Sequence, residues 1–233
     1  MKARGQRTSS KSSTRAWAEL ISLPRPAAVA FDLDGTLVDT EAILIEAQRQ
    51  TLMDFGFSDL ALDHPRTFGM GMEPGVTRLS EFYGLDYAKA LEVFRPHWTR
   101  LSATELTPMP GARALLMRLR DEGVRMALVT SADPVHARNA LKALDVPGAF
   151  ECVVDAEMVS RLKPSPEPYL KAAERLGVSP QDMLAIEDSG SGVESALAAG
   201  MKCVAVHVEV HERTELAQAQ VKIRTLIDFP QFM

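Results

Sequence analysis

Two aspartates near the beginning of the chain, Asp32 and Asp34, have the spacing and surroundings of a chemical site. They directly follow the apolar run 28–31, which has the composition of a buried strand, and Gly35 comes next. Burying two carboxylates side by side costs desolvation and mutual repulsion, so a fold keeps such a pair where a cation or a reaction uses it. Gly35 allows the chain to turn sharply after the pair. The stretch therefore predicts a cation site or a catalytic site at the end of a buried strand.

Further polar groups follow later apolar segments in the same way. Thr130 ends one such segment, and the pair Glu187 and Asp188 ends another. Lys163 lies between them in a loop that two prolines stiffen. Taken singly, each of these groups has another explanation. Thr130 and Asp188 could each cap a helix, and Lys163 could be a solvated loop lysine. The carboxyl ends of parallel strands share one edge of a sheet, so the order of these groups predicts that they converge on one pocket.

The segments around these groups alternate between strand-like and helix-like patterns. After the first strand, further strands are expected at 124–130, 151–155, 183–186 and 203–208, with an edge strand at 221–223. Helices are expected between them, at 112–122, 134–144, 166–176 and 192–199. This alternation predicts an α/β fold with a doubly wound parallel sheet.

The segment 40–105 carries helical patterns only and interrupts this alternation after the first strand. Helices are expected at 41–55, 75–83 and 86–101, with Thr40 as the N-cap of the first. An insertion at this point is typical of a lid or cap domain over a site. The predicted division of the chain is a basic extension at 1–26, a core domain formed by 27–39 and 106–233, and a helical cap at 40–105.

The loop 66–75, between the first two of these helices, is rich in glycine and methionine. Met70, Met72 and Glu73 are the candidate residues of the cap that contact the substrate. The alternative for the two methionines is that they pack against the cap helices as adaptable apolar side chains.

The composition is that of a globular protein, with 233 residues of which 46% are hydrophobic and 24% charged. The net charge of -5 leaves no basic footprint for nucleic acid, and no apolar run is long enough to span a membrane. Cys152 and Cys203 lie in separate strand-like segments and are expected to be reduced thiols, which favours the cytoplasm. Residues 1–26 are basic and rich in serine, which favours a disordered extension, with an organellar transit peptide as the alternative.

Four ordered motifs resemble those of the haloacid dehalogenase superfamily. They are Asp32-Leu33-Asp34-Gly35-Thr36, Leu128-Val129-Thr130-Ser131, Lys163-Pro164 and Ile186-Glu187-Asp188-Ser189. The helical insertion after the first motif is similar to that of the β-phosphoglucomutase and phosphoglycolate phosphatase branch. The resemblance covers nearly the whole chain from Ala28 onward. It implies a Rossmann-like core with an inserted cap, and a Mg²⁺-dependent phosphatase.

The resemblance also implies a role for each motif residue. Asp32 is the expected nucleophile, Asp34 the expected general acid and base, and Lys163 the expected positive charge beside them. The expected Mg²⁺ ligands are the carboxylates of Asp32 and Asp188 and the backbone carbonyl of Asp34, while Glu187 would hold a water of the ion. The groups expected to bind the phosphoryl oxygens are Lys163, Thr130 and the backbone N–H groups of Leu33, Asp34 and Ser131.

Departures from the family pattern narrow the reaction. Dehalogenase members lack the second acid, so Asp34 argues against dehalogenation. Phosphoglucomutase members carry a histidine at the position that corresponds to Leu44, and they hold a second phosphate with an arginine of the cap loop. In this chain only Arg66 or Arg78 could supply that arginine. These differences favour a hydrolase over a mutase.

The sequence therefore predicts a phosphatase that acts on a small phosphorylated metabolite, a sugar phosphate, through an aspartyl-phosphate intermediate. The alternatives are a β-phosphoglucomutase-type phosphomutase, a phosphoglycolate phosphatase, and a non-catalytic domain similar to a response regulator. The expected partner is the small phosphomonoester alone, with no nucleic acid and no membrane. The expected oligomeric state is a monomer or a weak homodimer.

Overall fold

A six-stranded parallel sheet forms the centre of the molecule in the computed structural model, which describes residues 25–58 and 72–229. Across the sheet, its strands follow the order β5 (Cys152–Val154), β4 (Arg125–Val129), β1 (Ala28–Phe31), β6 (Met183–Glu187), β7 (Lys202–Val206) and β8 (Val221–Ile223). All neighbouring strands pair in parallel. β1 lies between β4 and β6, and all four of its residues are fully buried. This confirms the predicted α/β fold with a doubly wound sheet.

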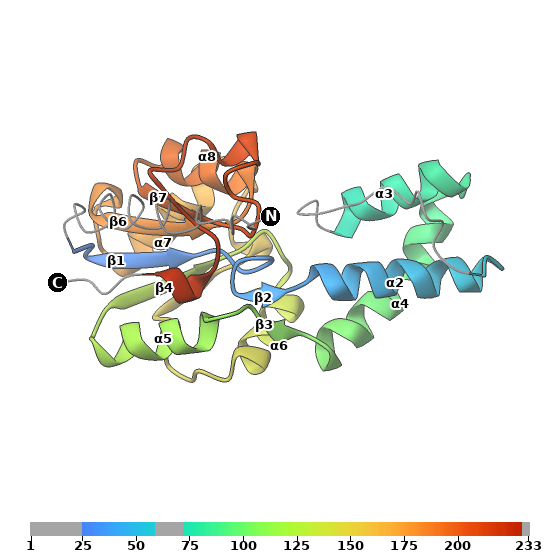
Figure 1. The fold of residues 1–233 in the computed structure, drawn as a ribbon, viewed down its shortest axis with the longest axis horizontal. Helices are drawn as coiled ribbons and strands as arrows, with labels where there is room; N and C mark the ends of the chain where they lie inside the picture. Colours follow the sequence, from blue (N-terminus) through green and yellow to red (C-terminus); the bar gives the residue numbers. More distant parts are fainter. Residues whose placement is uncertain (1–24, 59–71, 230–233) are drawn as a thin grey trace, which may run out of the picture.

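Four long helices cover the two faces of the sheet (Figure 1). They are α5 (Ala112–Asp121), α6 (Pro134–Leu144), α7 (Glu167–Leu176) and α8 (Gly190–Ala198). Successive residues of β1 point to opposite faces, so Val29 and Phe31 join the hydrophobic cluster of α5 and α6, whereas Ala28 and Ala30 join that of α7 and α8. Short 3₁₀ turns complete the connections, at Ala156–Met158, Pro180–Asp182, Thr214–Leu216 and Leu226–Asp228.

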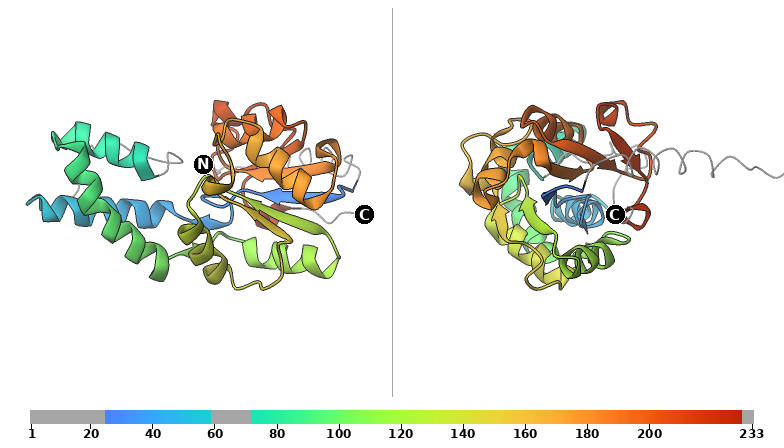
Figure 2. Two further views of the ribbon diagram at one scale, coloured as in Figure 1. Left: turned by 180° about the vertical axis from the view of Figure 1, so that it is seen from behind. Right: turned by 90° about the vertical axis from the view of Figure 1, so that its left-hand side faces the viewer.

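Three further helices form a separate unit beside one end of the sheet, which Figure 2 also shows from behind. They are α2 (Glu41–Asp54), α3 (Met72–Tyr83) and α4 (Tyr87–Thr104), and we call them the helical insertion. The chain enters this unit through β2 (Val38–Asp39) and leaves it through β3 (Thr107–Pro108). β2 and β3 pair in antiparallel fashion, Val38 with Pro108 and Asp39 with Thr107. The sequence did not predict this ribbon, because two residues are too few to form a recognisable strand pattern.

The ends of several helices differ from the sequence predictions. Thr40 occupies the N-cap position of α2, as predicted, but its side chain makes no capping bond. Instead Asp39 Oδ1 accepts the N–H groups of Glu41 and Ala42. Asp188 does not cap α8, because the hydroxyl of Ser189 accepts the N–H of Gly192. A side chain caps a helix only when its oxygen faces the free N–H groups of the first turn, which sequence position alone does not decide.

Some predictions fall outside the described residues. They include most of the basic extension, and Arg66 and Met70 in the cap loop. The domain division at residues 26, 39 and 105 stays a prediction. None of the helices among the described residues combines the length and hydrophobicity that a membrane crossing requires.

Candidate active site

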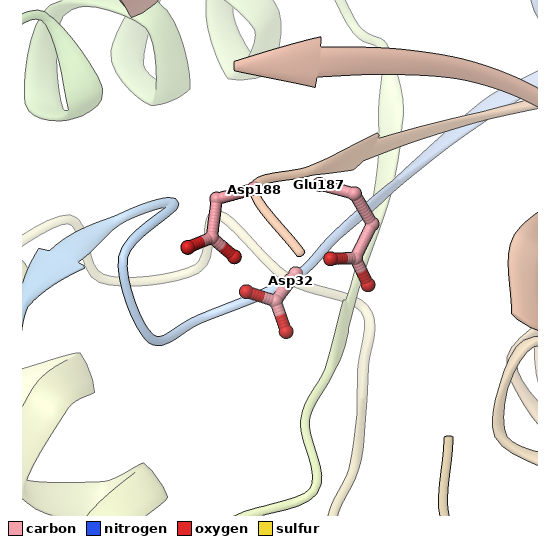
Figure 3. A group of neighbouring side chains, drawn as sticks. All are labelled: Asp32, Glu187 and Asp188. Carbon is pink, nitrogen blue, oxygen red and sulfur yellow. The ribbon is translucent and has the colours of Figure 1, made fainter. Parts of the chain in front are cut away.

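Carboxylates from two neighbouring strands meet at the carboxyl edge of the sheet. Asp32 directly follows β1, Glu187 is the last residue of β6, and Asp188 comes next. Because β1 and β6 are paired in register, with Phe31 beside Ile186, these acids reach the same place. Each of the three offers an oxygen within 4.8 Å of the others. Figure 3 shows the three carboxylates grouped around a common centre.

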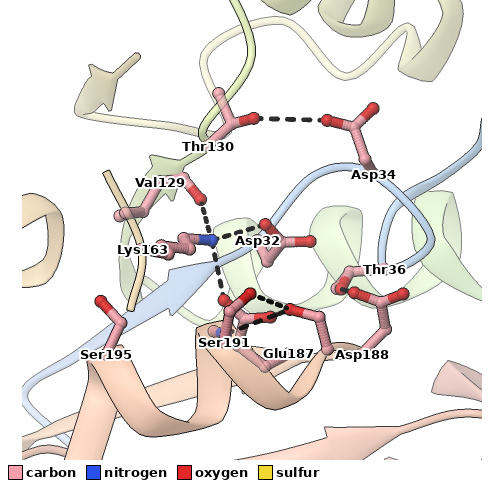
Figure 4. Close-up of polar contacts among 12 residues, drawn as sticks. Asp32, Asp34, Thr36, Val129, Thr130, Lys163, Glu187, Asp188, Ser191 and Ser195 are labelled. Atoms are coloured by element: carbon pink, nitrogen blue, oxygen red, sulfur yellow. Dashed lines mark hydrogen bonds and ion pairs between the residues drawn. The ribbon is translucent and has the colours of Figure 1, made fainter. Parts of the chain in front are cut away.

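Lys163 is the buried cation of this group, and only 4% of its side chain is exposed. Its Nζ donates to Asp32 Oδ1 at 2.6 Å, to Glu187 Oε1 at 2.7 Å and to the Val129 carbonyl at 2.9 Å, as Figure 4 shows. Burial alone would lower the pKa of Lys163, but Asp32 and Glu187 raise it more, so the net shift of the pKa is upward. The lysine is therefore held as a cation with all three of its protons directed to acceptors.

Glu187 is fully buried and both of its carboxylate oxygens accept hydrogen bonds. Besides the Lys163 ammonium, Oε1 accepts the phenol hydroxyl of Tyr169 at 2.6 Å, and Oε2 accepts the Ser189 hydroxyl at 3.2 Å. The Lys163 ammonium also lies 5.2 Å from the centre of the Tyr169 ring. Tyr169 is a contributor that the sequence analysis missed. Its only sequence signal was a place on the apolar face of α7, which every core residue of that helix shares.

The charge balance of this cluster favours a bound cation. The pKa of Asp32 is raised to about 7, first by burial and then by the charge of Glu187, while Lys163 opposes both. Burial also raises the pKa of Asp188 well above its usual range, with Asp32 and Glu187 adding to the shift. Asp32 Oδ2 is buried and has no hydrogen-bond partner among the described residues. An unpartnered carboxylate oxygen beside two further acids fits a hard divalent ion such as Mg²⁺, which prefers oxygen ligands.

Asp34 belongs to the same edge of the sheet but has different partners. Its Oδ1 lies 2.7 Å from His136 Nε2, and its Oδ2 accepts the Thr130 hydroxyl at 3.4 Å. In Figure 4 the Asp34 carboxylate is turned toward Thr130, whereas Asp32 lies beside Lys163. Asp34 is 35% exposed, so it is the acid of the site that solvent or a substrate reaches most easily. His136 is a second contributor that the sequence analysis missed.

Backbone N–H groups beside Asp32 are free to bind an anion. Within residues 25–58 and 72–229, no acceptor is found for the N–H of Leu33, Asp34 or Ser131. Thr130 is less available, because its hydroxyl oxygen also accepts the N–H of Ala132 at 3.0 Å. Free N–H groups beside a lysine match the acceptor oxygens of a phosphoryl group.

A family model described as haloacid dehalogenase-like hydrolase matches residues 29–206, most of the chain. The chain belongs to this family. The match includes all four motifs on which the resemblance rested, so the prediction of the family is confirmed.

This haloacid dehalogenase-like hydrolase is similar in sequence to two phosphatases and in structure to a further member of the family. It is 35% identical over 179 residues to the phosphorylated carbohydrates phosphatase of Thermotoga maritima, covering 75% of this chain and 82% of that protein. It is 38% identical over 185 residues to hexitol phosphatase A of Escherichia coli, covering 76% and 81%. A solved structure of a T. maritima protein, provisionally named a beta-phosphoglucomutase, aligns with a TM-score of 0.74 and 30% identity over 86% of this chain and 95% of that one. The hydrolase is of the phosphatase kind, as predicted.

Two of the three candidate substrate residues of the helical insertion, Met72 and Glu73, lie among the described residues. Met72 begins α3 and packs, partly buried, against the larger hydrophobic cluster. Glu73 is exposed in the first turn of the same helix. The contact of Met72 with the core fits the packing alternative, and Glu73 is free to face a ligand.

Proposed function

We propose that this hydrolase is a Mg²⁺-dependent phosphatase of a small sugar phosphate and that Asp32 is its nucleophile. The observation that carries the proposal is the state of the Asp32 carboxylate. One oxygen is held by Lys163, and the other is buried without a partner among the described residues, beside Glu187 and Asp188. The substrate class is suggested by the two relatives, which are named for phosphorylated carbohydrates and for hexitol phosphates.

A carboxylate nucleophile divides a very slow hydrolysis into two faster steps. Uncatalysed phosphomonoester hydrolysis needs acceleration by up to ~10²¹-fold. An Asp32 oxygen bonds to phosphorus while the bond to the sugar oxygen breaks, which leaves an aspartyl-phosphate and an alkoxide. Asp34 gives a proton to the leaving oxygen, and then takes a proton from the water that cleaves the aspartyl-phosphate. Its partial exposure suits an acid that must exchange protons with both.

Charge around the phosphoryl group comes from several sources. The carboxylates of Asp32 and Asp188 and the backbone carbonyl of Asp34 would hold Mg²⁺. Glu187, whose oxygens already accept hydrogen bonds, would act on a water of the ion. When bound, the ion supplies positive charge that offsets the charge of the phosphoryl oxygens. Lys163 supplies further positive charge beside the phosphoryl group, and the free N–H groups of the neighbouring backbone bind the remaining oxygens.

The alternative activity is phosphomutase, which the likeness to the provisionally named beta-phosphoglucomutase favours. A mutase returns the phosphoryl group to a second position of a sugar and needs groups in the cap to do so. Leu44, at the position where mutase members carry a histidine, is buried in the hydrophobic cluster and offers no proton-transfer group. The hydrolase is therefore the better-supported activity.

Phosphate release from a panel of sugar phosphates, hexitol phosphates, phosphoglycolate and nucleotides tests the proposal. The panel is run with Mg²⁺ and with a chelator, on the natural chain, on Asp32→Asn, and on Asp121→Asn as a matched control. Asp121 is an exposed partner of Arg120 and lies outside the site. We expect Mg²⁺-dependent release that falls at least ~1,000-fold in Asp32→Asn only. Release that persists in Asp32→Asn, or turnover only after a sugar bisphosphate is added, would contradict it.

A further inference from the structure

His136 connects the candidate active site to the helical insertion through both nitrogens of its ring. The residue lies on α6, and 3% of its side chain is exposed. Nε2 is 2.7 Å from Asp34 Oδ1, on the loop that follows β1. Nδ1 is 2.7 Å from the hydroxyl oxygen of Ser102, which belongs to α4 of the insertion. A single buried imidazole therefore bridges the most exposed acid of the site and a helix outside the sheet.

The flat face of the same ring is also held by α4. The ring of Trp98 stacks on His136, with centroids 5.3 Å apart and planes 22° apart. Trp98 lies one helical turn before Ser102, so the two residues present themselves on the same side of α4. Trp98 in turn stacks on Phe94, which is fully buried. The position of the His136 ring thus follows the position of α4.

We propose that His136 is a positioning residue that orients the Asp34 carboxylate for proton transfer and makes this orientation depend on helix α4 of the insertion. The inference rests on the role of Asp34 as the general acid in the proposed function. In this role His136 acts through its contact with Asp34 and not through a contact with the substrate.

The reason that Asp34 needs such a partner is its exposure. A carboxylate that is 35% exposed and held only by the 3.4 Å contact from Thr130 would sample several rotamers. The shorter contact to His136 selects one of them. Misplacing a reacting group by about 1 Å costs roughly 100-fold in rate. We therefore expect loss of the His136 contact to reduce turnover by about 10- to 100-fold when a proton must be delivered.

The dependence of the rate on the leaving group separates this role from a merely structural one. A primary alkyl phosphate from the panel above leaves as a strongly basic alkoxide and needs the proton of Asp34. p-Nitrophenyl phosphate leaves as a stable phenolate and needs it far less. We compare kcat/KM, which reports formation of the aspartyl-phosphate, because the later hydrolysis of that intermediate is common to both substrates. A variant that only disturbs the fold lowers kcat/KM for both substrates, whereas a variant that misplaces Asp34 lowers kcat/KM mainly for the alkyl phosphate.

Three variants and a control use this difference. His136→Phe keeps the ring stack on Trp98 and removes both polar contacts; we expect it to lose at least ~10-fold more kcat/KM on the alkyl phosphate than on p-nitrophenyl phosphate. His136→Gln keeps an N–H near the position of Nε2 and should recover most of that loss. Ser102→Ala removes the hydrogen bond from α4 to the ring but leaves the Trp98 stack, and it should give a smaller, alkyl-selective loss. His97→Phe, which removes another α4 histidine–carboxylate pair at 2.7 Å, should change neither rate.

Asp34→Asn on the same two substrates distinguishes failure of this inference from failure of the proposed function. If Asp34→Asn shows no alkyl-selective loss, then Asp34 is not the acid and the proposed mechanism fails. If Asp34→Asn is alkyl-selective but His136→Phe and Ser102→Ala lower both rates equally, or leave them unchanged, the positioning role is overturned. Should His136→Phe not fold, Ser102→Ala decides by the same criterion.

Discussion

Gly192 lies so close to the carboxyl group of Glu187 that a β-carbon at position 192 would overlap it. Gly192 is in the first turn of α8, and Glu187 is the last residue of β6. The helix reaches the strand end only because residue 192 has no side chain. Since Glu187 accepts the Lys163 ammonium, this close approach also sets where the lysine stands.

The first prediction is that Gly192→Ala destabilises the protein by about 1–3 kcal/mol, because Glu187 or α8 must move in a packed interior. It should also lower activity, since Lys163 moves with Glu187. Urea unfolding and phosphate release measure the two effects. Gly75→Ala is the matched helical control: its β-carbon would lie 3.4 Å from Gln48 and Leu44, and alanine favours a helix by up to ~1 kcal/mol. Equal stability of the two variants would contradict the prediction.

The second prediction concerns the buried ammonium. Lys163→Met leaves Asp32 and Glu187 buried without their cation, and removing one partner of a buried ion pair costs about 3–5 kcal/mol. We expect this loss in urea unfolding with a chelator present. Lys171→Met, which breaks an exposed pair with Glu174, should change the unfolding free energy by less than ~1 kcal/mol. A Lys163→Met protein as stable as the Lys171→Met protein would show that the acids do not depend on the lysine.

The third prediction separates the two roles of Asp188. With a chelator, Asp188→Asn should raise the thermal midpoint at neutral pH. Burial raises the pKa of Asp188, so its ionised form opposes folding. With Mg²⁺, the natural chain should have the higher thermal midpoint. A ligand at 100 times its Kd stabilises the protein that binds it by about 2.7 kcal/mol, and the variant has lost a ligand oxygen. Differential scanning calorimetry checks both. An equal Mg²⁺ shift in the variant would exclude Asp188 from the site.

The fourth prediction concerns the thiols, which are both free in the structure. Burial raises the pKa of Cys203 well above its usual range, and burial also raises that of the half-buried Cys152. Thiolate is the reactive form, so an alkylating reagent should modify Cys152 first and Cys203 only after unfolding. Labelling of Cys152 should still accelerate above pH 9, because its pKa is raised. Mass spectrometry of the labelled native protein measures both, and early modification of Cys203 would contradict its burial.

The groups that the sequence located and those that it missed differ in how they reach the site. Asp32 and Asp188 were predictable together because each follows a strand, and parallel strands bring their ends to one edge. His136 and Tyr169 approach from the sides of α6 and α7. Their contacts depend on how each helix is rotated and placed against the sheet. Helical periodicity assigns both residues to a buried face, as it does any leucine of the core, and carries no information about a partner 18 or 102 positions away.

The pairing of β2 with β3 places the two crossings between the sheet and the helical insertion side by side. The chain therefore crosses between the sheet and the insertion at one place, and these crossings lie outside the six paired strands of the sheet. Such a connection allows the helical insertion to be replaced as a unit without a change in the sheet. A different insertion joined through the same ribbon would leave the carboxylates and the lysine at the sheet edge in place.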